Sequence, residues 1–161
     1  MTARKKLLGE LMGRLTKVAM SGPEPNAAVL AELKALRDRL PHLTGTLVAS
    51  SDGLLVAHDL PPDIEPTRMA ALASAHLSLS YQLTATAHGG GFHEVVVHGT
   101  GGHAVIYAAG WASLMVLAGP EVNVGRLHLE SRPVARNIAD HLTATDSGKD
   151  RTWKTDRKEP I

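Results

Sequence analysis

Cysteine is absent from this chain of 161 residues, and aromatic residues make up only 3% of it. Without cysteine there can be no disulfide and no thiolate metal site, and a reducing compartment is compatible with the composition. The hydrophobic content of 43% is still enough for a core, which aliphatic residues and methionine must supply. A formal net charge of +1 argues against a dedicated nucleic-acid binder. We therefore expect one cytoplasmic domain of ordinary size with tails.

Charged side chains are nearly missing from the middle of the chain. Between Arg68 and Glu121 lie 52 residues, of which only Glu94 is an Asp, Glu, Lys or Arg. The overall charge frequency of 20% would place about ten there. An amphipathic helix or a half-exposed sheet normally keeps a charged face toward water. Because this stretch lacks such a face, we expect a partner chain to cover part of it.

The same stretch raises the question of a membrane span. Residues 69–88 are long enough to cross a bilayer, but His76 and Gln82 interrupt them. Residues 104–118 are more apolar, yet they fall short of the roughly 20 residues that a spanning helix needs. Charged residues also interrupt the apolar run 7–20, which is therefore not typical of a secretory signal. We expect no membrane span.

Apolar spacing predicts helices at the beginning of the chain. Residues 5–20 have the spacing of a short amphipathic helix, and residues 21–25 form a linker rich in proline. Asn26 is a plausible N-cap for a second helix, which Pro41 ends after Leu40. Residues 1–25 are thus expected to precede the domain proper.

A hairpin follows the second helix. The apolar runs 46–50 and 54–58 flank Ser51, Asp52 and Gly53. An Asp-Gly pair between two such runs predicts a tight turn whose two central residues both have positive φ.

A long, nearly uncharged helix is predicted over residues 67–87. We expect its stripe of Met69, Leu72, Leu79 and Leu83 to lie on the sheet. The opposite side is mostly small and uncharged, which permits close approach of another helix. We expect that side to face the partner; it carries Ala70, Ser74, Leu77, Ser78, Tyr81 and Ala85.

Three strands and a last helix complete the predicted domain. Glycine-rich turns separate the runs 92–98, 104–109 and 112–118, and loops this short force an antiparallel meander. An amphipathic pattern over 122–142 predicts the final helix, which Pro133 should kink or deprive of one hydrogen bond. The charged residues 144–161 are expected to be disordered. The fold class is therefore α/β over residues 26–143: a five-stranded antiparallel sheet between helices, in the order α-β-β-α-β-β-β-α.

At this point the chain resembles the roadblock family, which comprises dynein light chains and bacterial regulators of gliding-motility GTPases, with actinobacterial members. The resemblance is carried by Leu47-Val-Ala-Ser-Ser-Asp-Gly-Leu-Leu-Val-Ala57, the uncharged helix, Leu114-Met-Val-Leu-Ala118 and Asn123-Val-Gly-Arg-Leu127. It implies a homodimer in which the long helices of two subunits pack together. It also implies that the third strands meet edge to edge, which adds Phe92, Val95 and Val97 to the expected interface.

The resemblance further implies a function, the binding of a Ras-like small GTPase. The chain has no Gly-x-x-x-x-Gly-Lys-Ser/Thr motif, so it is not itself a P-loop GTPase. Paired carboxylates for acid–base work are missing from the middle of the fold, where the lone Glu94 is expected to be a solvated edge residue. Arg68 is the best-placed residue for a GTPase contact in trans, the alternative being a solvated arginine. We expect no catalytic residue and no cofactor.

Nine histidines invite a metal hypothesis. His98 and His103 flank a four-residue turn and can face each other across a hairpin. His93 lies five residues before His98, so on a regular strand the two point to opposite faces. We therefore interpret these as surface histidines and expect no metal site.

Three functions remain open. The first is a non-enzymatic homodimer that regulates a small GTPase. The second is a ligand-sensing module of profilin-like or PAS-like architecture, which would need a concave pocket with convergent polar groups. The third is a structural dimeric adaptor that works without a GTPase.

Overall fold

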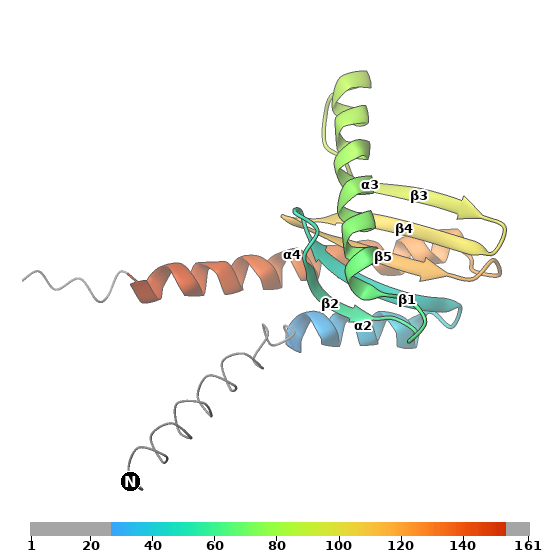
Figure 1. Cartoon of the computed structure of the whole chain (residues 1–161), viewed down its shortest axis with the longest axis horizontal. Coiled ribbons are helices and arrows are strands. Elements are labelled where there is room, and N and C mark those ends of the chain that lie inside the picture. The colour runs from blue at the N-terminus through green and yellow to red at the C-terminus, as the bar shows by residue number, and fades with distance from the viewer. Residues whose placement is uncertain (1–26, 154–161) are drawn as a thin grey trace, which may run out of the picture.

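A computed structural model describes residues 27–153 of the chain (Figure 1). The expected short helix over residues 5–20, the linker and the N-cap at residue 26 lie outside the described residues. The elements are helix α2 (Ala27–Arg39), strands β1 (Leu43–Ser50) and β2 (Leu55–Asp59), helix α3 (Pro66–Ala87), strands β3 (Glu94–Gly99), β4 (Gly102–Ala109) and β5 (Ala112–Ala118), and helix α4 (Val124–Trp153).

The five strands form one sheet in the order β2-β1-β5-β4-β3, and all neighbours are antiparallel. The predicted fold class and element order are therefore confirmed. Strands β3, β4 and β5 form the expected meander, whereas the first hairpin joins the sheet through the pairing of β1 with β5. Strand β3 lies at an edge of the sheet, with β4 as its neighbour (Figure 1).

Helices cover both faces of the sheet, and each face has its own core. On one face, α2 and α4 bury Leu33, Leu36 and Ile138 against strand residues such as Tyr107 and Val116. On the other face, α3 lies across the sheet, where Ala70 and Ala73 pack with Leu47, Ile106 and Met115. The alternation of Tyr107 and Ile106 between the two cores follows from the two-residue period of a strand. The result is the predicted sandwich of three layers.

The first hairpin is present, but its turn differs from the expected one. The amide of Gly53 donates to the carbonyl of Ser50 at 3.0 Å, and the amide of Ser50 donates to the carbonyl of Leu54 at 2.8 Å. Gly53 has φ of +87°, while Asp52, like every other non-glycine residue described, does not have positive φ. This is a three-residue loop with glycine in the left-handed position. The prediction of two central residues with positive φ was therefore wrong.

The last helix is longer than expected. It runs without interruption through Pro133 to Trp153 and so includes residues 144–153 of the segment that was expected to be disordered. Residues 154–161 lie outside the described part. A charged sequence is compatible with a helix that projects into water, because such a helix needs no apolar side.

The side of α3 that faces the sheet differs from the predicted one. Leu72, Leu79 and Leu83 were expected to face the sheet, but they are 43%, 65% and 71% exposed. Ala70, expected on the partner side, is fully buried against the sheet together with Ala73. Small side chains at these two positions permit a close approach of helix and sheet, and the bulky leucines lie outside.

Candidate functional site

The long helix α3 begins with a well-defined cap. The carboxylate of Glu65 accepts hydrogen bonds from the amides of Thr67 at 3.0 Å and Arg68 at 2.6 Å, and Pro66 occupies the first turn. These backbone hydrogen bonds, first that of Arg68 and then that of Thr67, lower the pKa of Glu65. The side chain of Arg68, the predicted GTPase contact, is exposed in this first turn. It therefore lies at the opposite end of α3 from the exposed Leu79 and Leu83.

The other end of α3 extends beyond the sheet. At about 1.5 Å per residue, its 22 residues span about 33 Å. Five strands spaced about 4.8 Å apart cover only about 19 Å. Because α3 crosses all five strands, its C-terminal turns project past the edge strand β3 (Figure 1). We call residues 79–87 the overhang of α3.

Helix α3 exposes large side chains on two sides, and most of them belong to the overhang. Leu72, Leu79 and Leu83 recur at spacings of seven and four, so they form one line along the helix. Tyr81, which is 57% exposed, lies on the other side of the helix with Ser78 and Ala85. No charged residue occurs between positions 69 and 93. The overhang therefore presents apolar and small polar side chains to water.

A groove of about 490 Å³ runs beside this helix on the sheet side. Five of the residues expected at the partner interface meet in its walls, namely Ser74, Leu77, Ser78, Tyr81 and Phe92. Ser74 is fixed there because its hydroxyl donates to the carbonyl of Ser51 at 2.5 Å. Leu77 is half-buried against the core under α3, so only part of it faces the groove.

The edge strand contributes the remaining expected interface residues. Val95 packs in part against the core under α3, and Val97 is more exposed. Residues 95 and 97 share one face of β3, whereas Val96 packs against the core on the other face. The two valines thus lie on the same face of the sheet as the overhang. Leu72, Leu79 and Leu83 are exposed as well, although they were expected to face the sheet. Because neither side of the helix is charged, their spacing was consistent with either orientation.

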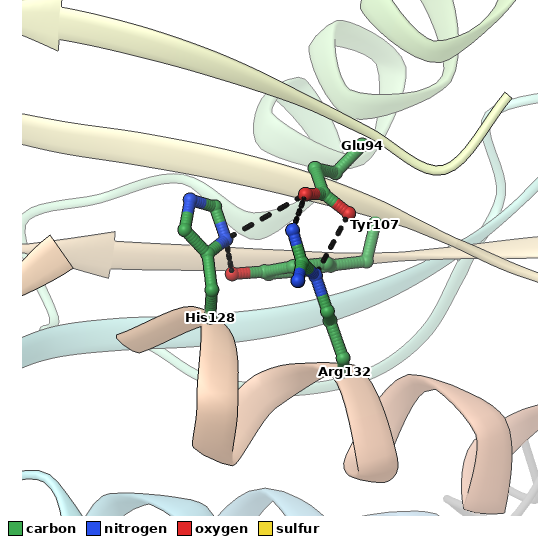
Figure 2. A network of polar contacts seen from close by, with 4 residues as sticks. All are labelled: Glu94, Tyr107, His128 and Arg132. Carbon is green, nitrogen blue, oxygen red and sulfur yellow. Dashed lines mark hydrogen bonds and ion pairs between the residues drawn. The ribbon is translucent and has the colours of Figure 1, made fainter. Parts of the chain in front are cut away.

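A network of polar side chains lies on the opposite face, between α4 and the edge of the sheet (Figure 2). Arg132 donates from Nε to Oε2 of Glu94 at 3.3 Å, and its Nη2 forms a second, short contact with Oε1. Nδ1 of His128 lies 3.9 Å from Glu94 and 2.9 Å from the hydroxyl of Tyr107. The Glu94 side chain is only 15% exposed. The expectation that Glu94 is a solvated edge residue was therefore wrong.

These contacts perturb two ionisable groups. The hydrogen bond from Arg132 lowers the pKa of Glu94, and the positive charge of Arg132 acts in the same direction. Burial raises the pKa of the Tyr107 phenol to about 12, and the nearby carboxylate of Glu94 adds to the effect. Tyr107 therefore stays protonated, and Glu94 stays ionised, throughout the neutral range.

The two histidines of the β3–β4 hairpin face each other, as expected. His98 and His103 are partners in the strand register, and their Nδ1 atoms are 2.9 Å apart. Within residues 27–153, however, no group of three or more histidine, aspartate or glutamate side chains is arranged to hold a metal ion. Across the same residues, no helix has both the length and the apolar character that crossing a membrane requires.

Comparisons with known proteins agree with this architecture. The sequence model of the Roadblock/LC7 domain matches residues 29–118, more than half of the chain. A solved Roadblock/LC7 domain from Streptomyces avermitilis is 31% identical, with a TM-score of 0.65 over 70% of this chain and 96% of that one. MglB from Myxococcus xanthus has a TM-score of 0.69 over 78% of this chain and 95% of its own; at 13% identity the likeness is one of fold. An uncharacterised protein of Methanocaldococcus jannaschii is 27% identical over 110 residues, which cover 68% of this chain and 90% of that protein.

This chain belongs to the Roadblock/LC7 family, and the resemblance found in its sequence is confirmed.

Proposed function

We propose that this chain is a non-enzymatic homodimeric regulator that binds a Ras-like small GTPase and modulates its nucleotide cycle. The observation that carries the proposal is the overhang of α3, which exposes Leu79, Tyr81 and Leu83 beyond the edge of the sheet. Membership of the Roadblock/LC7 family, together with a fold like that of the gliding protein MglB, supports a role in regulating GTPases.

A second copy of the chain is the occupant that fits this surface best. The outer side of the edge strand β3 offers unpaired backbone groups, which pair readily with another strand. The overhang offers apolar side chains on the same side of the molecule. In a twofold dimer each patch meets its own copy, so an uncharged patch is self-complementary and brings no like charges together. This arrangement also accounts for the 52 residues that carry a single charge.

The dimer is tested by charge substitution on the overhang. In light scattering after size exclusion, the full chain should have about twice the monomer mass of 17.1 kDa. Tyr81→Glu and Leu83→Glu should give folded monomers, because each buries an unpaired charge in the interface. Leu129→Glu is the matched control: Leu129 on α4 is 72% exposed, like Leu83, and its variant should stay dimeric. Leu77 is a poor target because it packs within its own subunit.

Dimers that survive both overhang substitutions would remove the overhang from the interface, and a wild-type chain that runs as a monomer would overturn the homodimer. Circular dichroism of each variant separates loss of the dimer from loss of the fold.

Binding of a GTPase needs its own test. Ras-like small GTPases from the same genome, loaded with GDP or with a non-hydrolysable GTP analogue, would be titrated with the wild-type chain. We expect binding to prefer one nucleotide state, because a partner that favours one arrangement of the switch loops shifts their population. Arg68→Ala should weaken binding by about fivefold or more if this exposed arginine is a central contact.

A chain that binds no GTPase in either nucleotide state would instead be a dimeric adaptor without a GTPase. Equal binding of the wild type and Arg68→Ala would remove Arg68 from the contact surface and leave the rest of the proposal in place.

A further inference from the structure

A second hollow lies on the face of the sheet opposite α3. It has a volume of about 390 Å³ and opens between α4 and the beginning of β3. Small-molecule sites typically occupy about 300–1,000 Å³. The hollow is lined by His93, Glu94, Tyr107, Ala108, Arg132, Ala135 and Arg136. It is thus large enough for a small ligand, and it opens on the face of the sheet opposite the overhang.

The walls of this hollow carry an excess of positive charge. Glu94 and Arg132 neutralise each other through two contacts. Arg136 also lines the hollow, and within the described residues its guanidinium forms no hydrogen bond or ion pair. His93 adds a ring nitrogen, and its position is fixed because its carbonyl accepts a hydrogen bond from the amide of Ala108 at 2.9 Å. One guanidinium therefore remains for an external anion.

The geometry of α4 favours a planar anion. Arg132 and Arg136 are four residues apart, so they lie one turn apart on the same side of the helix. A guanidinium presents a flat fork of donors that matches the two oxygens of a carboxylate. Ala135 lines the same hollow and offers apolar contact. Ala108 lines it too, although the two-residue period of β4 turns its side chain, like that of Ile106, toward the face covered by α3. The hollow thus combines one free cation with a small apolar wall.

The charge balance discriminates between anions. A monocarboxylate brings one negative charge to one unpaired guanidinium. A phosphate dianion brings about two, and the Glu94 carboxylate in the same wall would repel it more strongly.

We infer that this hollow binds a small monocarboxylate, with the carboxylate on Arg136 and the apolar body against Ala135. The inference does not depend on the proposed dimer or on GTPase binding. The carboxylate site and the proposed function can therefore be tested, and can fail, independently. In this arrangement Glu94 holds Arg132 in place and sets an upper limit to the negative charge that the site accepts.

The test uses the full chain and benzoate as the probe, followed by amide chemical shifts and by calorimetry. Benzamide serves as the neutral isostere, and inorganic phosphate as the dianion. Benzoate should shift the amides of His93, Ala108 and Ala135, and it should bind about tenfold or more tightly than benzamide, because a charge-assisted hydrogen bond is lost in the amide. Phosphate should bind more weakly than benzoate.

Three variants make the test specific. Arg136→Gln should weaken benzoate binding about tenfold. Lys34→Gln removes the same charge from α2, outside the hollow, and should leave the affinity unchanged. Glu94→Gln should tighten binding, because it removes a negative charge from the wall and releases Arg132 for the ligand.

Several results would overturn the inference. If Arg136→Gln and Lys34→Gln weaken benzoate binding equally, the loss of affinity comes from the change in net charge and not from a contact with Arg136. Equal affinity for benzoate and benzamide would exclude a carboxylate site. Loss of binding in a folded Glu94→Gln variant would contradict the assigned role of Glu94, and amide shifts confined to other parts of the chain would place any binding elsewhere.

Discussion

Glu94 is the single charged residue between Arg68 and Glu121, and its environment explains why a charge is tolerated there. Its carboxylate turns toward α4, where Arg132 pairs with it. The two residues are 38 positions apart in the chain, and no local pattern in the sequence connects them. The sequence could therefore indicate that Glu94 was unusual, but its partner became visible only when α4 was placed against the sheet edge.

The Glu94–Arg132 pair makes stability depend on pH on the acid side. The folded-state pKa of Glu94 lies below the usual glutamate value of about 4.3. Its contribution is therefore complete above about pH 4.3 and is lost as the pH falls through the lower, folded-state pKa. At pH 7, Glu94→Gln should lower the free energy of unfolding by up to about 1 kcal/mol, since Arg132 is largely exposed and the pair is screened by solvent.

Urea unfolding at pH 7 and at pH 3 checks this prediction. The difference between wild type and Glu94→Gln should shrink at pH 3, because this pH lies below the unfolded-state pKa of about 4.3 and protonation of the unfolded chain reduces the contribution of the carboxylate. A difference that is the same at both pH values would show that the effect comes from packing instead of charge.

Glycine 102 is a second residue whose role depends on its surroundings. Its φ is +150°, and a Cβ built there would lie 2.4 Å from the carbonyl oxygen of Ala118, which cannot move without disturbing β5. Gly102→Ala should therefore destabilise the fold by about 1–3 kcal/mol. Gly101→Ala is the matched control, because a Cβ at Gly101 meets no atom within 4 Å, and it should change stability little. Thermal unfolding of the two variants compares them directly, and equal melting temperatures would contradict the clash.

At the scale of the elements, periodicity predicted the helices and strands within the described residues, because each has a clear apolar pattern and glycine or proline at its ends. The start of α3 was predicted at Thr67 and lies at Pro66. The side of α3 that faces the sheet was assigned incorrectly. Both sides of this helix are uncharged, so the usual contrast between a polar and an apolar side was absent. Side-chain size then decides which side packs: the small Ala70 and Ala73 lie against the sheet, and the larger leucines remain exposed.

The lack of charge also made part of the candidate site predictable from the sequence. The lack of charge indicated that this helix and β3 need a partner, and Ser78, Tyr81 and Val97 are indeed exposed. The hollow beside α4 could not be predicted, since its walls come from three segments that only the fold brings together.

Edge strand β3 gives a prediction at this scale. In the proposed dimer, β3 of one subunit pairs with β3 of the other, so the amides on its outer side are hydrogen-bonded. Amide hydrogen exchange over residues 94–99 should then be slow in the wild type and distinctly faster in the monomeric Leu83→Glu variant. The amides of β1, which lies between β2 and β5, should change little and provide the internal control. Equally fast exchange of β3 in both proteins would argue against edge-to-edge pairing.

At the scale of the whole molecule, helices cover the two faces of the sheet to different extents. On one face, α2 and α4 bury a complete core that reaches from Val29 to Leu142. On the other face, a single helix covers the sheet and then continues past its edge (Figure 1). The two proposed sites are divided in the same way: the dimer surface lies on the α3 side, and the carboxylate hollow lies on the α4 side.

The overhang of α3 has a consequence for how much of the protein a cell must make. In the proposed dimer, part of the folding free energy is released only on association, so stability follows mass action and rises with the amount of chain present. Dilution should lower the melting temperature of the wild type but leave that of Leu83→Glu unchanged. Below the dissociation constant, each chain would expose an uncharged helix and an open strand edge, a combination that favours aggregation. In the proposed dimer, the stability of the fold would therefore depend on the abundance of the protein.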